Sequence, residues 1–259
     1  MRAKSSPTDP VTVVDTDTER LLRDRLAQLR PGDPILGEEG GGPADVTATP
    51  SDRVTWVLDP IDGTVNFVYG IPAYAVSIGA QVGGITVAGA VADVAARTVY
   101  SAATGLGAHL TDERGRHVLR CTGVDELSMA LLGTGFGYSV RCREKQAELL
   151  AHVVPLVRDV RRIGSAALDL CMVAAGGVGA HYQHGGEGGG CGGCRARNRR
   201  RAVGGATAIQ RPRADPGLSR PISSCWRGSW PAARDLRARW RRGAGWQARR
   251  RCRRCVPAW

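Results

Sequence analysis

Lysine, methionine and phenylalanine are scarce in this chain of 259 residues. It has 34 arginines but two lysines, together with three methionines and two phenylalanines. No apolar run approaches the roughly 18 residues that a membrane-spanning helix needs. The first residues, Met1–Lys4, lead into polar sequence without the apolar core of a signal peptide. We therefore expect a cytoplasmic protein that does not insert into a membrane.

The scarcity is greatest in residues 185–259, which contain no lysine and six residues of Val, Ile, Leu, Met or Phe. This segment has 19 arginines and three acidic residues, a net charge of +16, whereas residues 1–184 have 17 basic and 21 acidic residues, a net charge of −4. We call residues 1–184 the body and residues 185–259 the tail. Because so little apolar surface cannot offset the entropy of an ordered chain, the tail is predicted to be disordered.

Two hypotheses account for the tail. Arg, Gly, Ala, Pro, Cys and Trp without Lys are what a GC-rich gene yields in a wrong reading frame, so we expect a frameshift after about residue 184. Alternatively, the tail is a nucleic-acid-binding module, because arginines interleaved with tryptophans attract and stack on RNA or DNA without sequence preference. Its pairs Cys191/Cys194 and Cys252/Cys255 could hold Zn²⁺. However, 57 residues separate these pairs, far more than the roughly 15–20 of common zinc modules.

The body is organised around residues 53–64. Val54–Leu58 is β-branched and aromatic, which predicts a buried strand that ends at Asp59-Pro60, because proline cannot continue a hydrogen-bonded ladder. Asp59 and Asp62 follow, beside Gly63 and Thr64. Carboxylates gathered on a tight turn are ligands that Mg²⁺ prefers. The alternative is a polar turn that closes a strand and binds nothing.

Residues 56–67, Trp-Val-Leu-Asp-Pro-Ile-Asp-Gly-Thr-Val-Asn-Phe, resemble the first signature of the inositol monophosphatase family. Other blocks resemble that family in the same order: Lys4–Pro7, Val11–Asp15, Ile35–Glu39 and Arg162–Ala167. The resemblance extends from about residue 4 to about residue 184. It implies a layered α-β-α-β-α fold, a homodimer, a small phosphate monoester such as inositol monophosphate as substrate, and Mg²⁺ as cofactor.

The resemblance also implies roles for single residues. As metal ligands it implies Glu38, Asp59, the Ile61 carbonyl and Asp62, with Asp15 in the outer shell. As catalytic residues it implies Glu38, Thr64 and Asp59, where Glu38 and Thr64 orient the attacking water. As substrate-binding residues it implies Asp62, Gly63, Thr64, Gly164 and Ser165. Phosphatases that form an aspartyl phosphate are a rival class, but their two aspartates lie two residues apart, whereas Asp59 and Asp62 lie three apart.

The chain departs from the family pattern at both ends. The helix that usually precedes the Lys4–Pro7 block is absent, so we expect a truncated start. Gln183 stands where the family usually has glutamate, and no Trp-Asp pair, which carries the last metal aspartate, follows His184. We therefore expect the second half of the fold to be incomplete and this chain, as written, to have little activity.

Other elements follow from local patterns. Thr16–Glu19 has the form of a capping box and predicts a helix that ends before Pro31, with a solvated charged face. Strands are predicted at 74–82 and 85–94, joined by a turn at Gly83-Gly84, and at 98–102. Ser165 opens a small-residue helix over 166–175, and its N-terminus is either a phosphate site or an ordinary serine cap. The body cysteines, Cys121, Cys142 and Cys171, are expected to be reduced and buried.

Overall fold

The computed structural model describes residues 2–3, 10–42 and 53–183. The predictions for the tail concern residues outside these ranges, so they stay predictions. None of the helices in the described part of the chain is both long and apolar enough to cross a membrane. A short antiparallel pair, β1 (Arg2–Ala3) and β2 (Pro10–Val11), precedes the main elements.

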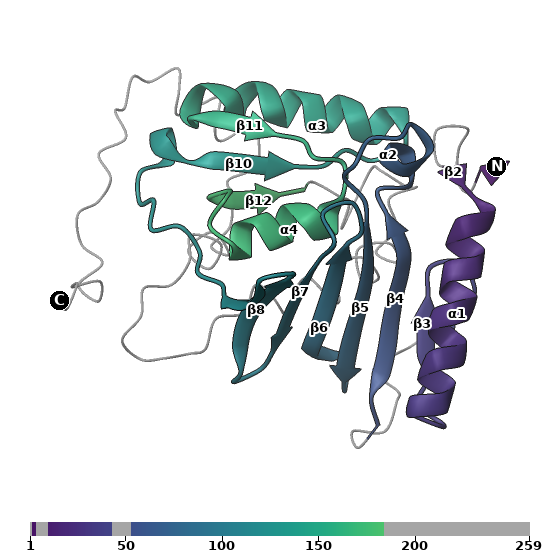
Figure 1. Cartoon of the computed structure of the whole chain (residues 1–259). Helices are drawn as coiled ribbons and strands as arrows, with labels where there is room; N and C mark the ends of the chain where they lie inside the picture. Colours follow the sequence, from purple (N-terminus) through teal and green to yellow (C-terminus); the bar gives the residue numbers. More distant parts are fainter. Residues whose placement is uncertain (1, 4–9, 43–52, 184–259) are drawn as a thin grey trace. The chain divides into compact units, whose positions relative to one another are not determined.

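A seven-stranded sheet contains Thr55–Asp62, the greater part of the stretch 53–64 (Figure 1). Its strands are β3 (Ile35–Gly37), β4 (Thr55–Asp62), β5 (Ala75–Val82), β6 (Ile85–Asp93), β7 (Thr98–Ala103), β8 (Gly107–Asp112) and β9 (Gly115–Val118). They are hydrogen-bonded in sequence order, and all neighbours are antiparallel except β3 and β4. Gly83 and Gly84 have positive φ angles of 55° and 74°, as a tight two-residue hairpin requires. The predicted hairpin is therefore confirmed.

A second, three-stranded sheet is entirely parallel. Its strands are β10 (Leu131–Thr134), β11 (Asp159–Arg161) and β12 (Ala180–Tyr182), in the order β11-β10-β12. The helices are α1 (Val13–Leu29), α2 (Thr64–Val68), α3 (Val140–Val153) and α4 (Ala166–Ala174), with 3₁₀ turns η2 (Leu127–Met129) and η3 (Val154–Leu156).

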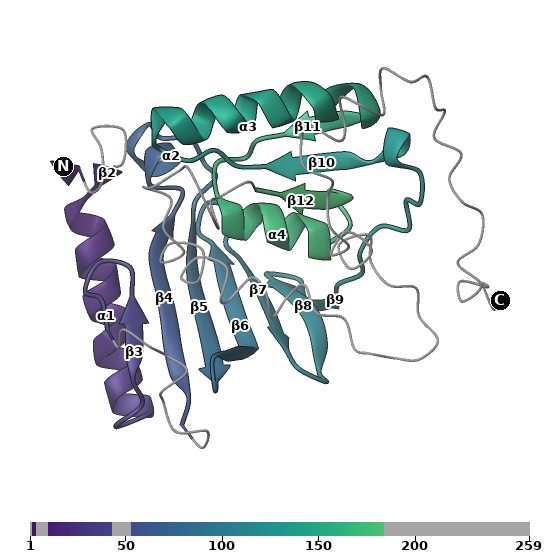
Figure 2. The same cartoon turned by 180° about the vertical axis from the view of Figure 1, so that it is seen from behind.

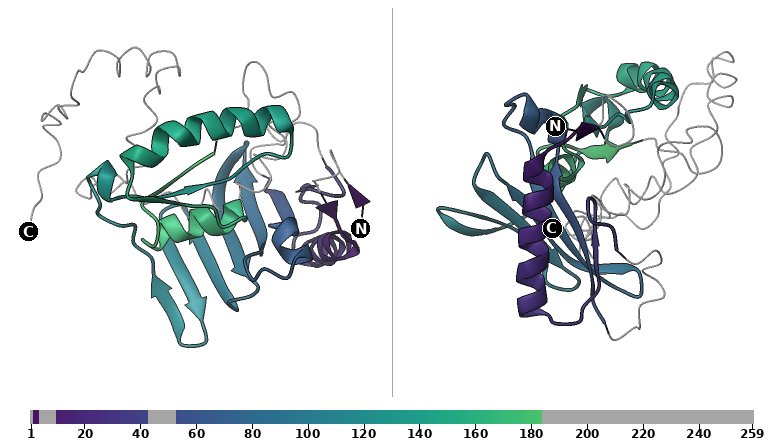
Figure 3. Two further views of the ribbon diagram at one scale, coloured as in Figure 1. Left: turned by 90° about the horizontal axis from the view of Figure 1, so that it is seen from above. Right: turned by 90° about the vertical axis from the view of Figure 1, so that its right-hand side faces the viewer.

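Helix and sheet layers alternate. Seen from above, α4 lies between the two sheets and α3 covers the small sheet (Figure 3). Ala167 and Cys171 of α4 pack on Ala75, Val91 and Ala102 of the large sheet. A second cluster joins Leu132 of β10 to Val153, the last residue of α3, and to Val157, which follows η3. The helix α1 packs against β4 and runs beside β3, near the N-terminus (Figure 2). The predicted mixed α and β fold of layered sheets and helices is confirmed.

Three local predictions were wrong. The strand β4 does not end at Pro60 but continues to Asp62. Pro60 fits because β3 ends opposite Leu58, and a bulge leaves no register partner on β5 between Asp59 and Asp62. The cap of α1 is Thr12 with Asp15 rather than Thr16 with Glu19, so the helix starts earlier than expected. Cys121 is exposed, whereas the other two body cysteines are buried as predicted.

Candidate functional site

The bulge in β4 brings the two aspartates of the central motif to one side. Three residues apart in a regular strand, they would face opposite sides of the sheet. Asp59 pairs with Ser77 and Asp62 with Ala75, so β4 has three steps where β5 has two. The one extra residue in β4 shifts the alternation of its side chains, so Asp59 and Asp62 face the same side of the sheet. Asp59 is 3% exposed, which is unusual for an aspartate unless it is paired or binds a cation.

The N-terminus of α4 holds the Asp62 carboxylate. The Ser165 hydroxyl and the Ala167 amide both donate to Asp62 Oδ2, each at 2.6 Å. Ser165 also caps α4 by accepting from the Leu168 amide at 3.2 Å. Burial raises the pKa of Asp62 to about 6, these two hydrogen bonds oppose the rise, and the negative charge of Glu38 adds to it. Ser165 therefore serves as a cap and as a donor to Asp62.

Thr64, two residues after Asp62, forms a second buried contact with Asp15. The Thr64 hydroxyl lies 3.0 Å from the Ile61 carbonyl and 3.3 Å from Asp15 Oδ1. Asp15 is 1% exposed, and its other oxygen accepts from the Thr12 amide at 2.8 Å and from the Thr12 hydroxyl at 2.6 Å. A hydroxyl has one proton, so Thr64 donates to one oxygen at a time and keeps its lone pairs for another donor.

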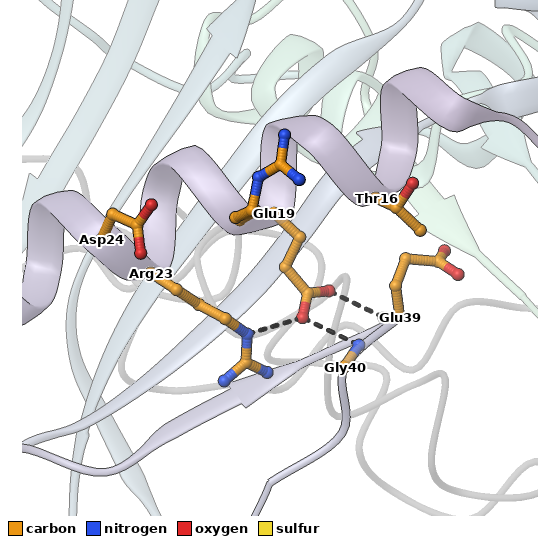
Figure 4. A pocket seen from close by; sticks show the side chains of 7 residues that line it. Thr16, Glu19, Arg23, Asp24, Glu39 and Gly40 are labelled. Atoms are coloured by element: carbon orange, nitrogen blue, oxygen red, sulfur yellow. Dashed lines mark hydrogen bonds and ion pairs between the residues drawn. The ribbon is translucent and has the colours of Figure 1, made fainter.

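Glu38 follows the last residue of β3 and begins a turn. A bridge closes this turn, because the Gly37 amide donates to the Gly41 carbonyl at 2.8 Å. Glu19 of α1 holds this turn, because its carboxylate accepts from the amides of Glu39 at 2.7 Å and Gly40 at 2.8 Å (Figure 4). A pocket of about 280 Å³ opens here. It is lined by Thr16, Glu19, Arg20, Arg23, Asp24, Glu39 and Gly40. The prediction that the charged face of α1 is merely solvated is therefore wrong at Glu19, which is 2% exposed.

The predicted metal ligands fit Mg²⁺ by their chemistry. Glu38, Asp59, Asp62 and the Ile61 carbonyl are hard oxygen donors, and the charge of Glu38 reaches Asp62. In the described ranges, no group of three or more His, Cys, Asp or Glu side chains converges closely enough to hold a metal ion. Carboxylates repel one another, and a cation between them would reverse that repulsion. Their roles as ligands, and that of Asp15 in the outer shell, stay predictions.

The two glycines assigned to substrate lie against each other. Gly63 has a φ angle of 98°, and an added Cβ would lie 3.0 Å from the Ala73 carbonyl oxygen and 3.2 Å from that of Gly164. Gly164 also has a positive φ angle, of 101°, and a Cβ there would overlap the Asn66 amide. The Asn66 side chain donates to the carbonyls of Ala73 at 2.7 Å and Ile163 at 2.9 Å. Asn66, which joins these segments, was missed in the sequence, although it lies inside the motif of residues 56–67.

A buried polar pair beneath the site was also missed. Burial, and after it the charge of Asp62, raises the pKa of Asp169 in α4 to about 7. Burial lowers the pKa of His181 in β12 to about 4. The two side chains lie 3.7 Å apart, but these pKa values describe a neutral imidazole near a carboxyl group that protonates easily, and not an ion pair. Gln183, at the end of β12, packs against Gly135.

Comparison with known proteins gives consistent matches. The model of the inositol monophosphatase family matches residues 1–191. The inositol-1-monophosphatase SuhB of Mycobacterium tuberculosis is 97% identical over 185 residues, which are 71% of this chain and 64% of that protein. The inositol-1-monophosphatase of Mycobacterium leprae is 76% identical over 184 residues, 71% of this chain and 63% of that protein. The chain thus spans a little under two thirds of the length of these relatives.

The structural comparison agrees. The solved structure of Mycobacterium tuberculosis SuhB superposes with a TM-score of 0.66 and 80% identity, over 78% of this chain and 73% of that one. An inositol monophosphatase from Anabaena superposes with a TM-score of 0.63 at 29% identity, over 77% of this chain and 73% of that one. The layered arrangement described above is therefore the arrangement of these solved structures over the matched part.

Proposed function

The chain belongs to the inositol monophosphatase family, and from that premise we propose that it is built to hydrolyse a phosphate monoester with Mg²⁺ as cofactor. Inositol monophosphate is the substrate we infer, because relatives of 97% and 76% identity are named inositol-1-monophosphatases. The observation that carries the proposal is the fixed Asp62 carboxylate, which two donors of α4 hold within reach of the charge of Glu38.

Each residue has a part in the proposal. Glu38, Asp59, Asp62 and the Ile61 carbonyl would hold Mg²⁺, which supplies positive charge for the phosphate oxygens and lowers the pKa of a bound water. The buried Thr64 hydroxyl would orient the attacking water together with Glu38. Asp15 would fix the Thr64 hydroxyl from the outer shell, in keeping with the 3.3 Å between their oxygens.

We propose that fewer residues contact the substrate directly than the sequence suggested. Asp62 would contact the substrate as well as the cation. Gly63, Thr64 and Gly164 would contact the phosphate or the sugar through their backbone, while both glycines pack tightly on neighbouring protein atoms. Ser165 is 0% exposed and binds Asp62, so we propose that it acts on the substrate through Asp62.

Phosphate release from inositol 1-phosphate, followed against Mg²⁺ concentration, tests the proposal. Asp59→Asn keeps the shape of the side chain and removes one charge from the site, so Mg²⁺ affinity and turnover should fall together while the fold survives. Unchanged Mg²⁺-dependent phosphate release by Asp59→Asn would refute the assignment. Acid trapping with labelled substrate separates the rival class, because a stable phosphoenzyme would exclude attack by water.

The chain as written should be a poor catalyst. The family's last metal aspartate is missing after His184, and loss of one carboxylate ligand weakens charge neutralisation in the transition state. We expect phosphate release at least about a thousandfold below that of a version with the reading frame restored after residue 184. Comparable rates in both versions would contradict this expectation.

A further inference from the structure

The turn that carries Glu38 is held from outside the site by two residues of α1. Glu19 Oε2 accepts from the Glu39 amide at 2.7 Å, and Glu19 Oε1 accepts from the Gly40 amide at 2.8 Å. Arg23, one helical turn on, donates through Nε to Glu19 Oε1 at 2.8 Å. Its Nη2 donates to the Gly41 carbonyl at 2.6 Å. The Glu19–Arg23 pair thus binds backbone groups of three successive residues, Glu39, Gly40 and Gly41.

The turn is shaped to receive this pair. A Cβ at Gly37 would overlap Glu19 Oε1, and a Cβ at Gly40 would lie 2.7 Å from the same oxygen. The carboxylate therefore lies directly on the backbone, where larger residues would push it away. Glu19 is 2% exposed, so its charge is shielded from water and depends on Arg23 and the two amides. Figure 4 shows the Glu19 carboxylate pointing from α1 toward Glu39 and Gly40, with Arg23 beside it.

The exposed charged pair next to Glu19 and Arg23 on α1 is recorded only as a contact within the helix. Arg20 pairs with Asp17 on the same helix at 3.0 Å, and their side chains are 73% and 53% exposed. An exposed pair of this type contributes little to stability. The Glu19–Arg23 pair, of which Glu19 is buried and Arg23 half-buried, by contrast connects the helix to a turn about 20 residues away, and Glu38 lies in that turn.

We propose that Glu19 and Arg23 are positioning residues, which hold the 38–41 turn so that the Glu38 carboxylate is presented to Mg²⁺. The inference rests on the proposed function, because it assumes that Glu38 is a ligand. An unheld turn leaves Glu38 free to move, and the cation must then order it at the moment of binding. The cost appears in Mg²⁺ affinity, since a preorganised ligand binds more tightly than one that must first be ordered.

The test compares Glu19→Gln and Arg23→Lys with matched changes on the same helix. Glu19→Gln presents one oxygen and one NH₂ group to two amide donors, so it keeps the shape and loses one acceptor. Arg23→Lys keeps the charge but cannot reach Glu19 and the Gly41 carbonyl with one planar group. The controls are Asp17→Asn and Arg20→Lys, which make the same chemical changes in the exposed pair.

Two measurements on the full chain need no catalysis. Hydrogen exchange in metal-free protein should become faster at the amides of residues 39 and 40 in both test variants, and stay unchanged in the controls. Titration calorimetry with Mg²⁺ should show affinity about tenfold weaker in Glu19→Gln, equal to about 1.4 kcal/mol. Far-UV circular dichroism of each variant checks that the fold is retained.

Kinetics separate positioning from a merely structural role. If the pair positions Glu38, the half-saturating Mg²⁺ concentration should rise about tenfold, while KM for the phosphate monoester at saturating Mg²⁺ changes little. Partial unfolding would lower the active fraction and hence kcat, and would leave both constants unchanged. Equal Mg²⁺ affinity in the unaltered chain and Glu19→Gln would overturn the inference and leave the proposed function standing. Failure of the unaltered chain to bind Mg²⁺ would overturn both.

Discussion

Replacing Ser165 with alanine should destabilise the fold more than the loss of an ordinary helix cap. The Ser165 hydroxyl accepts from the Leu168 amide at 3.2 Å and donates to Asp62 Oδ2 at 2.6 Å. Losing a cap costs about 1 kcal/mol, and losing a hydrogen bond to a charged group costs about 1.5–3 kcal/mol. With both lost at a residue that is 0% exposed, we expect Ser165→Ala to lower the free energy of unfolding by about 2–4 kcal/mol.

Ser139→Ala is the matched control. Ser139 caps α3 by accepting from the Cys142 amide at 3.3 Å, and among the described residues no carboxylate is recorded as a partner of its hydroxyl. Its loss should cost about 1 kcal/mol or less. Urea unfolding followed by far-UV circular dichroism is the assay, because five of the six tryptophans lie in the tail and would dominate fluorescence. Equal costs for the two serines would refute the argument that Ser165 anchors Asp62.

Three further predictions concern the site, the buried pair and the tail. Thr64→Val should leave Mg²⁺ binding nearly unchanged in calorimetry and reduce turnover, because it removes only the hydroxyl that we propose orients water; a matching loss of Mg²⁺ affinity would speak against this role. The pKa of Asp169 is raised to about 7 in the folded protein, so its contribution to stability is fully present below the pKa of the unfolded state, about 3.9, and is lost as pH rises through about 7. Asp169→Asn should therefore gain stability relative to the unaltered chain between pH 5 and pH 8 in thermal melts, and a difference that does not vary with pH would show that Asp169 does not titrate in this range. In the tail, limited trypsin digestion should remove residues 185–259 first, with no protection in hydrogen exchange; protection that depends on Zn²⁺ and is lost on chelation would favour the zinc-binding alternative.

The sequence predicted the elements whose signals are local. The Gly83-Gly84 turn, its flanking strands and the helix that Ser165 opens each depend on residues close together in the chain, and the structure confirms them. The family motif likewise located Asp59, Asp62 and Thr64. The error at Pro60 had a tertiary cause, because proline is tolerated where neither adjacent strand needs its amide. That depends on where β3 ends and on the bulge opposite β5.

Only the tertiary structure decided what Glu19, Asn66 and Asp169 do. Glu19 has the spacing of a capping residue, but its carboxylate binds amides 20 and 21 residues away. Asn66 joins the motif to Ile163, 97 residues on. The pKa of Asp169 follows from burial and from the charge of Asp62. A sequence pattern records which groups are present and their local spacing, whereas hydrogen bonds and charges act through space, so their partners are fixed only when the sheets and helices have packed.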